Sequence, residues 1–157
     1  MYKRQGRSFI AGADISEFGK SFDGPDLNST LRDIEFSKKP VIAAINGTAL
    51  GGGLETALVC NYRMGTNKAI VGLPEVNLGL LPGAGGTQRL PRLVGPGEAL
   101  KMMLSGGHVP ATKALHMVIV DKISENVVED AMAFVKEVSE SVENHPKVRD
   151  KNEKMIE

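Results

Sequence analysis

The chain alternates between two kinds of hydrophobic pattern. Short, largely apolar runs predict buried strands, and these runs are 8–12 (SFIAG), 41–45 (VIAAI), 62–66 (YRMGT), 69–73 (AIVGL) and 118–123 (VIVDKI). Apolar residues at helical spacing predict helices, and these stretches are 27–39, 52–59, 96–106, 109–117 and 126–142. Strands that alternate with helices in this way indicate the α/β class with a largely parallel sheet.

The two ends of the chain lack these patterns. Residues 1–6 (MYKRQG) show neither alternation nor an apolar face, and we interpret them as a spurious start of a truncated domain. Residues 143–157 are almost purely polar, which predicts a polar tail, a linker or a frayed helix. The domain itself is therefore predicted over residues 7–142.

Composition narrows the class of protein. Of the 157 residues, 41% are hydrophobic and 24% charged, which is typical of a soluble globular domain. Nineteen basic residues balance nineteen acidic ones, which argues against a nucleic-acid partner. No apolar stretch approaches the roughly 20 residues of a membrane-spanning helix, and the N-terminal residues lack the apolar h-region of a secretory signal.

Few side chains are suited to metal or disulfide chemistry. Cys60 is the single cysteine and is predicted to be a small core residue. His108, His116 and His145 are scattered without the spacing of metal ligands. We therefore expect no metal site.

Two glycine-rich segments each precede a helical stretch, Gly51–Gly53 and Gly83–Gly86. Free N–H groups at a helix start favour an anion, but neither segment has the pattern of a nucleotide phosphate loop. The other use of such N–H groups is an oxyanion hole, which needs acid–base groups nearby. Glu55 and Glu75 are the candidates, although from the residues alone a helix-start charge and a loop charge are the more common explanations.

Three segments in succession carry a family resemblance. They are SFIAGADISEF, KPVIAAINGTALGGGLETALVCNYRM and VGLPEVNLGLLPGAGGTQRLPRLVG. The chain resembles the enoyl-CoA hydratase/isomerase (crotonase) family from Arg7 to Ile123, and more loosely through the last helix. The resemblance implies a crotonase-like spiral of ββα units, present here as a partial domain over 7–142, with 1–6 outside the family pattern.

The resemblance also implies roles for particular residues. The backbone N–H groups of Ala13 and Gly52 would hold the thioester oxygen, and Glu55 and Glu75 would share one water. The Ala11 carbonyl would contact the adenine of coenzyme A. The N–H of Gly83 would orient a catalytic carboxylate. The remaining residues expected at the substrate are Gly12, Asp14, Gly51 and Pro74, although Asp14 also suits the N-cap of a short helix over 15–19.

The implied reaction is hydration of a trans-2-enoyl-CoA to a 3-hydroxyacyl-CoA. Glu55 would deprotonate the water, and Glu75 would deliver a proton to C2, which requires a raised pKa. No metal or redox cofactor is implied, because coenzyme A enters only as part of the acyl-CoA substrate. Double-bond isomerisation, another reaction of this fold, and an inactive truncated module remain alternatives.

Several further expectations follow from the resemblance. The sequence of the third segment most resembles that of hydratase domains in multifunctional fatty-acid oxidation enzymes. In those enzymes a 3-hydroxyacyl-CoA dehydrogenase follows in the same chain. A homo-oligomer and a bacterial cytoplasmic or peroxisomal location are implied, with no targeting signal visible. Val118 stands where a glycine is common, which predicts a strained or reshaped turn. Residues 102–104 (MML) are expected in the core or the acyl-pocket wall.

Overall fold

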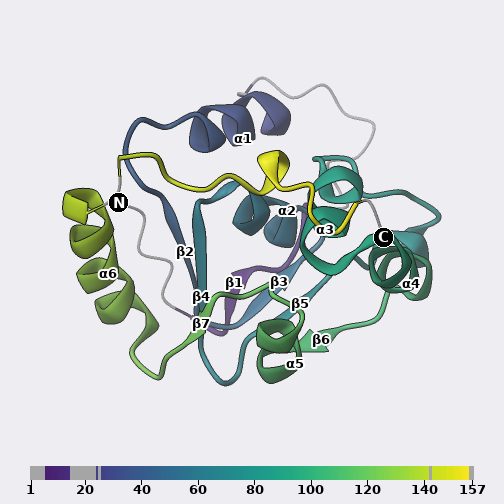
Figure 1. Cartoon of the computed structure of the whole chain (residues 1–157). Coiled ribbons are helices and arrows are strands. Elements are labelled where there is room, and N and C mark those ends of the chain that lie inside the picture. The colour runs from purple at the N-terminus through teal and green to yellow at the C-terminus, as the bar shows by residue number, and fades with distance from the viewer. Residues whose placement is uncertain (1–5, 15–23, 25, 142, 156–157) are drawn as a thin grey trace.

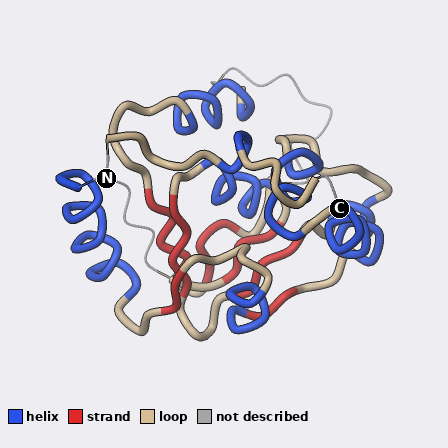
Figure 2. The backbone as a smooth tube through the Cα atoms, viewed as in Figure 1, coloured by secondary structure: helices blue, strands red, loops and turns tan. Residues whose placement is uncertain are grey.

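The computed structural model describes residues 6–14, 24, 26–141 and 143–155. Its strands form two small sheets with helices around them (Figure 1, Figure 2). One sheet has the order β2-β4-β7, all parallel, with β2 at Ile42–Ile45, β4 at Tyr62–Gly65 and β7 at Lys122–Ile123. The other has the order β1-β3-β5-β6, with β1 at Ser8–Ile10, β3 at Thr48–Leu50, β5 at Ile70–Gly72 and β6 at Val109–Pro110. Among the described strands, only the β5–β6 pair is antiparallel.

In two successive units of the chain, a strand of each sheet is followed by a helix. β2 lies in the first sheet and β3 in the second, and the chain continues into α2 (Gly52–Val59). β4 and β5 repeat this order and lead through the 3-10 turn η2 (Glu75–Leu78) to α3 (Gly86–Val94). The prediction of an α/β fold with ββα units and largely parallel sheets is confirmed.

The remaining helices lie close to their predicted ranges. They are α1 (Leu27–Glu35), α4 (Pro96–Ser105), α5 (Ala111–His116) and α6 (Val127–Ser141). The Asp26 carboxylate caps α1 by accepting a hydrogen bond from the Ser29 N–H at 3.1 Å. Gly106, in the left-handed region, ends α4 as the sequence predicts.

Among the described residues, four short elements were not predicted, namely β3, β6, η2 and the 3-10 turn η3 (Val148–Asp150). Each has four residues or fewer, which is too short for a hydrophobic period to be recognised. Conversely, the strand predicted over 118–123 is reduced to Lys122–Ile123. Ile119 and Val120 are buried in the core without belonging to a strand, so their apolar character reflects packing.

The predicted irregularity at Val118 is present in the backbone. Val118 has φ +61°, and it is the one non-glycine residue with a positive φ in the described part of the chain. A β-branched side chain is strained in this region. We expect Val118→Gly to raise the free energy of unfolding by about 1 kcal/mol, because the strain is removed and the half-exposed valine buries little surface. Denaturant unfolding of both proteins measures this, and Val118→Ala, which keeps a Cβ, should recover less of the gain.

Both faces of β2 are covered, as the sequence predicts for this strand. Ala43 and Ile45 point into the main hydrophobic core. Ile42 and Ala44 face a second cluster formed with Met64 of β4 and with residues of α6. Cys60 also lies in the main core, and burial raises the pKa of its thiol to about 12. It is therefore a core residue, as expected.

A buried ion pair links β4 to the segment before β7. Arg63 is 1% exposed, and its Nη2 lies 2.9 Å from Oδ2 of Asp121. The same guanidinium donates to the carbonyl oxygens of Ile119 and Cys60. This pair stabilises the sheet edge where β7 joins β4.

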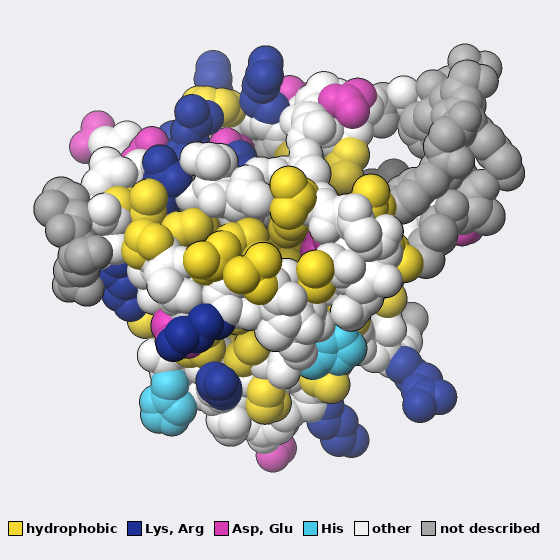
Figure 3. All heavy atoms as spheres, turned by 90° about the vertical axis from the view of Figure 1, so that its right-hand side faces the viewer, with side chains coloured by type: hydrophobic (Ala, Val, Ile, Leu, Met, Phe, Trp, Pro, Cys, Tyr) yellow, Lys and Arg dark blue, Asp and Glu magenta, His cyan; other side chains and the backbone are white. Residues whose placement is uncertain are grey.

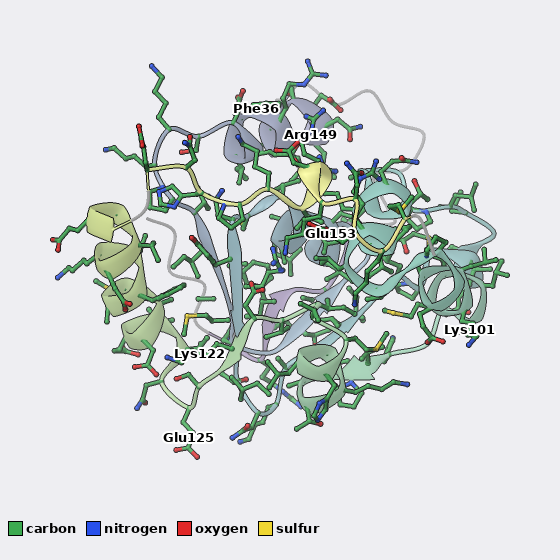
Figure 4. The ribbon with its side chains drawn as sticks, viewed as in Figure 1. Phe36, Lys101, Lys122, Glu125, Arg149 and Glu153 are labelled. Atoms are coloured by element: carbon green, nitrogen blue, oxygen red, sulfur yellow. The ribbon has the colours of Figure 1, made fainter. Side chains whose placement is uncertain are left out.

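The polar C-terminal segment lies against the domain, although its composition predicts a linker or frayed helix. Val148, in the 3-10 turn η3 (Val148–Asp150), is 2% exposed and belongs to the main core. The Asn61 side chain donates to the Pro146 carbonyl oxygen at 3.1 Å. The Arg149 guanidinium lies 5.1 Å from the Phe36 ring centre (Figure 4). The segment is therefore held by one buried apolar residue together with a hydrogen bond and a cation–π contact. The predicted domain boundary at residue 142 stays a prediction.

Candidate active site

Three parallel strands end at the same edge of one sheet. β1 pairs in parallel with β3, and β3 with β5, so their carboxyl ends lie side by side. The chain leaves β1 into residues 11–14, leaves β3 into the start of α2, and leaves β5 towards η2. Ligands of open α/β sheets bind outside the carboxyl ends of the strands. The topology therefore brings the three sequence segments with candidate chemistry together.

A cavity of about 520 Å³ lies at this edge. Its lining includes the predicted site residues Ala11, Gly12, Ala13, Gly51, Gly52, Glu55, Pro74, Glu75 and Gly83. Asp14 is not among the lining residues, and the helix expected over 15–19 lies outside the described residues. The remaining lining residues, which the sequence did not single out, are Leu27, Asn28, Asn77, Leu78, Leu80, Leu81 and Ala84.

The three glycines before Glu55 have different neighbours. A Cβ on Gly53 would lie 2.0 Å from the carbonyl oxygen of Ile10, so this glycine allows α2 to pack directly on β1. A Cβ on Gly51 would lie 3.1 Å from Oε1 of Glu75. Gly52 lines the cavity and is the first residue of α2, where a backbone N–H has no acceptor within the helix.

Glu55 is held by the start of another helix. Its side chain is 2% exposed, and Oε1 accepts hydrogen bonds from the N–H groups of Ala84 and Gly86, both at 2.8 Å. We expected the N–H of Gly83 to orient a carboxylate, but these donors lie one and three residues later. The physical reason is that α3 begins at Gly86, and N–H groups at a helix start are free to bind an anion.

Glu75 has a different environment on the same cavity. Its Oε2 is buried and has no hydrogen-bond partner among the described residues. Burial raises the pKa of Glu75 above its ordinary value, and the negative charge of Glu55 raises it further, against the effect of the backbone N–H of Glu75 itself. This environment therefore favours the protonated form of Glu75.

One wall of the cavity is apolar and reaches the surface. Leu78, Leu80 and Leu81 line it and are 52%, 43% and 79% exposed. Apolar side chains gather on the face of the molecule that carries α4 (Figure 3). Of the residues expected in the core or the acyl-pocket wall, Met102 lies in the core, Met103 packs against it and Leu104 is exposed. None of the three lines the cavity.

Comparison with known proteins agrees with this fold. The family model described as enoyl-CoA hydratase/isomerase matches residues 4–154. The chain therefore belongs to the enoyl-CoA hydratase/isomerase family. Similar proteins include the peroxisomal bifunctional enzyme of Danio rerio, 54% identical over 127 residues, which are 80% of this chain and 18% of that protein. The probable enoyl-CoA hydratase of Bacillus subtilis is 44% identical over 147 residues, which are 87% of this chain and 57% of that protein.

Solved structures show the same fold. The crystal structure of an enoyl-CoA hydratase from Bacillus anthracis matches with a TM-score of 0.78 and 36% identity, and the match covers 85% of this chain and 55% of that one. The chain thus spans less than two thirds of the length of each of these three proteins. Within the described residues, no helix is long and apolar enough to cross a membrane.

Proposed function

We propose that this chain carries the catalytic centre of an enoyl-CoA hydratase, which adds water to a trans-2-enoyl-CoA and forms a 3-hydroxyacyl-CoA. The observation that carries the proposal is the pair of carboxylates on one cavity. Glu55 accepts hydrogen bonds from two backbone N–H groups. Glu75 has a raised pKa, and its buried Oε2 has no hydrogen-bond partner among the described residues. A base and an acid in such different settings are what the addition of water across a double bond requires.

The thioester oxygen would be held by the backbone N–H groups of Ala13 and Gly52. Attack of water at C3 moves electrons onto this oxygen, so donors aimed at it lower the barrier. Removing one such donor in other enzymes costs roughly 2.7–4 kcal/mol of transition-state stabilisation. Both residues line the cavity beside Glu55, which supports this assignment.

The two glutamates would divide the remaining steps. Glu55 takes a proton from the water as the oxygen bonds to C3, and Glu75 delivers a proton to C2, so that one water is added in all. The reaction neither oxidises nor reduces the substrate, and it therefore requires no redox cofactor. Coenzyme A is part of the substrate, with its adenine beside the Ala11 carbonyl and the acyl chain along Leu78, Leu80 and Leu81.

The product suggests a partner activity. A 3-hydroxyacyl-CoA is the substrate of a 3-hydroxyacyl-CoA dehydrogenase, and a similar protein is named peroxisomal bifunctional enzyme. We propose that such a dehydrogenase, in the same chain or in a partner, consumes the product. A bacterial cytoplasmic or peroxisomal location and a homo-oligomeric state remain proposals of the same kind.

Incubation of the purified chain with crotonyl-CoA tests the proposed function. We expect loss of absorbance from the conjugated thioester, and a product that is heavier by one water. Conversion of a 3-enoyl-CoA to the 2-enoyl isomer without hydration would instead assign an isomerase. Absence of both reactions, together with absence of coenzyme A binding, would contradict an enzymatic role for this chain and leave a module that only folds.

A further inference from the structure

A second buried ion pair lies next to residues 84–86, which hold Glu55 through two N–H groups and are called the 84–86 loop below. Glu35, at the end of α1, is only 2% exposed. Its two carboxylate oxygens accept hydrogen bonds from Nε and Nη2 of Arg89 in α3, both at 2.8 Å. This bidentate contact fixes both the position and the orientation of the guanidinium group.

The same guanidinium lies directly against the loop. Its Nη1 donates to the carbonyl oxygen of Ala84 at 3.3 Å. A Cβ on Gly85 would lie 2.0 Å from that nitrogen, and Gly85 has φ +94°, so only glycine fits there. Ala84 and Gly86, on either side of Gly85, are the residues whose N–H groups hold Glu55. A continuous set of contacts therefore runs from Glu35 through Arg89 and the loop to Glu55.

We propose that Glu35 and Arg89 are positioning residues for the reaction. The proposal rests on the proposed function, in which Glu55 acts on the water. Arg89 binds the Ala84 carbonyl oxygen and so orients the 84–86 loop, whose N–H groups then point at Oε1 of Glu55. Glu35 in turn fixes the position of Arg89. Small displacements of a catalytic group lower the rate strongly, because the reacting atoms must meet in one geometry.

The C-terminal segment takes part in this set of contacts. Nη1 of Arg149 lies 3.4 Å from Oε2 of Glu35, and the guanidinium stacks on Phe36 at the end of α1 (Figure 4). Arg149 is 48% exposed, so its contact is weaker than that of Arg89, which is 15% exposed. The pair with Arg89 is therefore the one to test.

Glu35→Gln tests the proposal, since glutamine keeps the shape but removes the charge. We expect kcat for crotonyl-CoA hydration to fall by about 10- to 100-fold, as is typical when an outer partner of a reacting group is lost, with KM close to the wild-type value. Arg89→Lys keeps the positive charge but loses the bidentate contact with Glu35, and it should lower kcat by a similar factor. In Arg89→Ala, added guanidinium at sub-denaturing concentration should restore part of kcat, because a cavity of about 450 Å³ opens beside Arg89 and Glu35.

The matched control is Asp121→Asn, which breaks the other ion pair with a buried arginine. Arg63 and Asp121 contact neither the cavity nor the 84–86 loop, so this variant should lower Tm and leave kcat unchanged. If Glu35→Gln also lowers only Tm, the pair is merely structural and the proposal is wrong.

Amide hydrogen exchange separates this proposal from the proposed function. We expect the N–H groups of Ala84 and Gly86 to exchange faster in Glu35→Gln than in the wild type, whereas the N–H groups of β4 keep their protection. If the wild-type chain does not hydrate crotonyl-CoA, the proposed function fails, and exchange at Ala84 and Gly86 still decides whether Glu35 positions the loop. Unchanged exchange at both residues would overturn the proposal.

Discussion

Glu75→Gln is expected to lower the rate of hydration by about 10²- to 10⁴-fold, the range that a positioned acid–base group contributes, while raising Tm at neutral pH. The rate falls because an amide cannot deliver a proton to C2. Tm rises because glutamine removes a carboxylate that the folded protein disfavours. A variant that loses activity and gains stability has not lost its fold.

The pH dependence of this gain follows from the sign of the shift. Burial and the charge of Glu55 raise the pKa of Glu75 in the folded state. The protonated carboxyl therefore contributes stability below the unfolded pKa, and this contribution is lost as pH rises through the folded pKa. The Tm difference between Glu75→Gln and the wild type should be small in acid and grow towards neutral pH. Thermal unfolding of both proteins across this range measures it.

The same shift predicts the pH profile of the reaction. A proton donor works only while it is protonated, so kcat/KM should fall as pH rises through the pKa of Glu75. Glu75→Gln should lose that limb of the profile. Glu125→Gln is the control, because Glu125 is an exposed carboxylate far from the cavity (Figure 4). A near-normal rate in Glu75→Gln, or lower stability at neutral pH, would contradict this role.

Much of the site could be predicted because its residues lie in the three segments that carry the family resemblance. From the residues alone, three glycines before a helix indicate a close neighbour, and the carboxylate that follows them fits an ordinary helix-start charge. Alternating strands and helices predict a largely parallel sheet, but not the short strand β3, which lies between β1 and β5 at the edge where Ala13, Gly52 and Glu75 line one cavity. The site's position outside the strand ends is a property of this class of fold.

The parts that could not be predicted depend on contacts distant in sequence. Nothing local indicates that Gly53 faces the Ile10 backbone, or that Ala84 and Gly86 rather than Gly83 donate to Glu55. The Glu35–Arg89 pair joins residues 54 positions apart, and either side chain alone resembles an ordinary surface charge. Val148 has polar neighbours and therefore no local apolar pattern, yet it is buried and helps to hold the C-terminal segment against the domain.

Glu55→Gln is expected to lower the rate of hydration by about 10²- to 10⁴-fold, as Glu75→Gln does. Its effect on stability is expected to differ. Glutamine retains a side-chain oxygen that accepts the N–H groups of Ala84 and Gly86, so Tm should stay near the wild-type value. The rate falls because this neutral oxygen cannot take a proton from water. Steady-state kinetics and thermal unfolding of the same preparations measure both quantities.

Glu55→Ala separates the two functions of this side chain. Alanine removes the base and also leaves two buried N–H groups without an acceptor, at about 1–3 kcal/mol each. We therefore expect both variants to be inactive, with Glu55→Gln as stable as the wild type and Glu55→Ala clearly less stable. A near-normal rate of hydration by Glu55→Gln would show that the carboxylate serves only to cap the N-terminus of α3. Equal stability of the two variants would mean that water satisfies those N–H groups and that the cavity is open at this point.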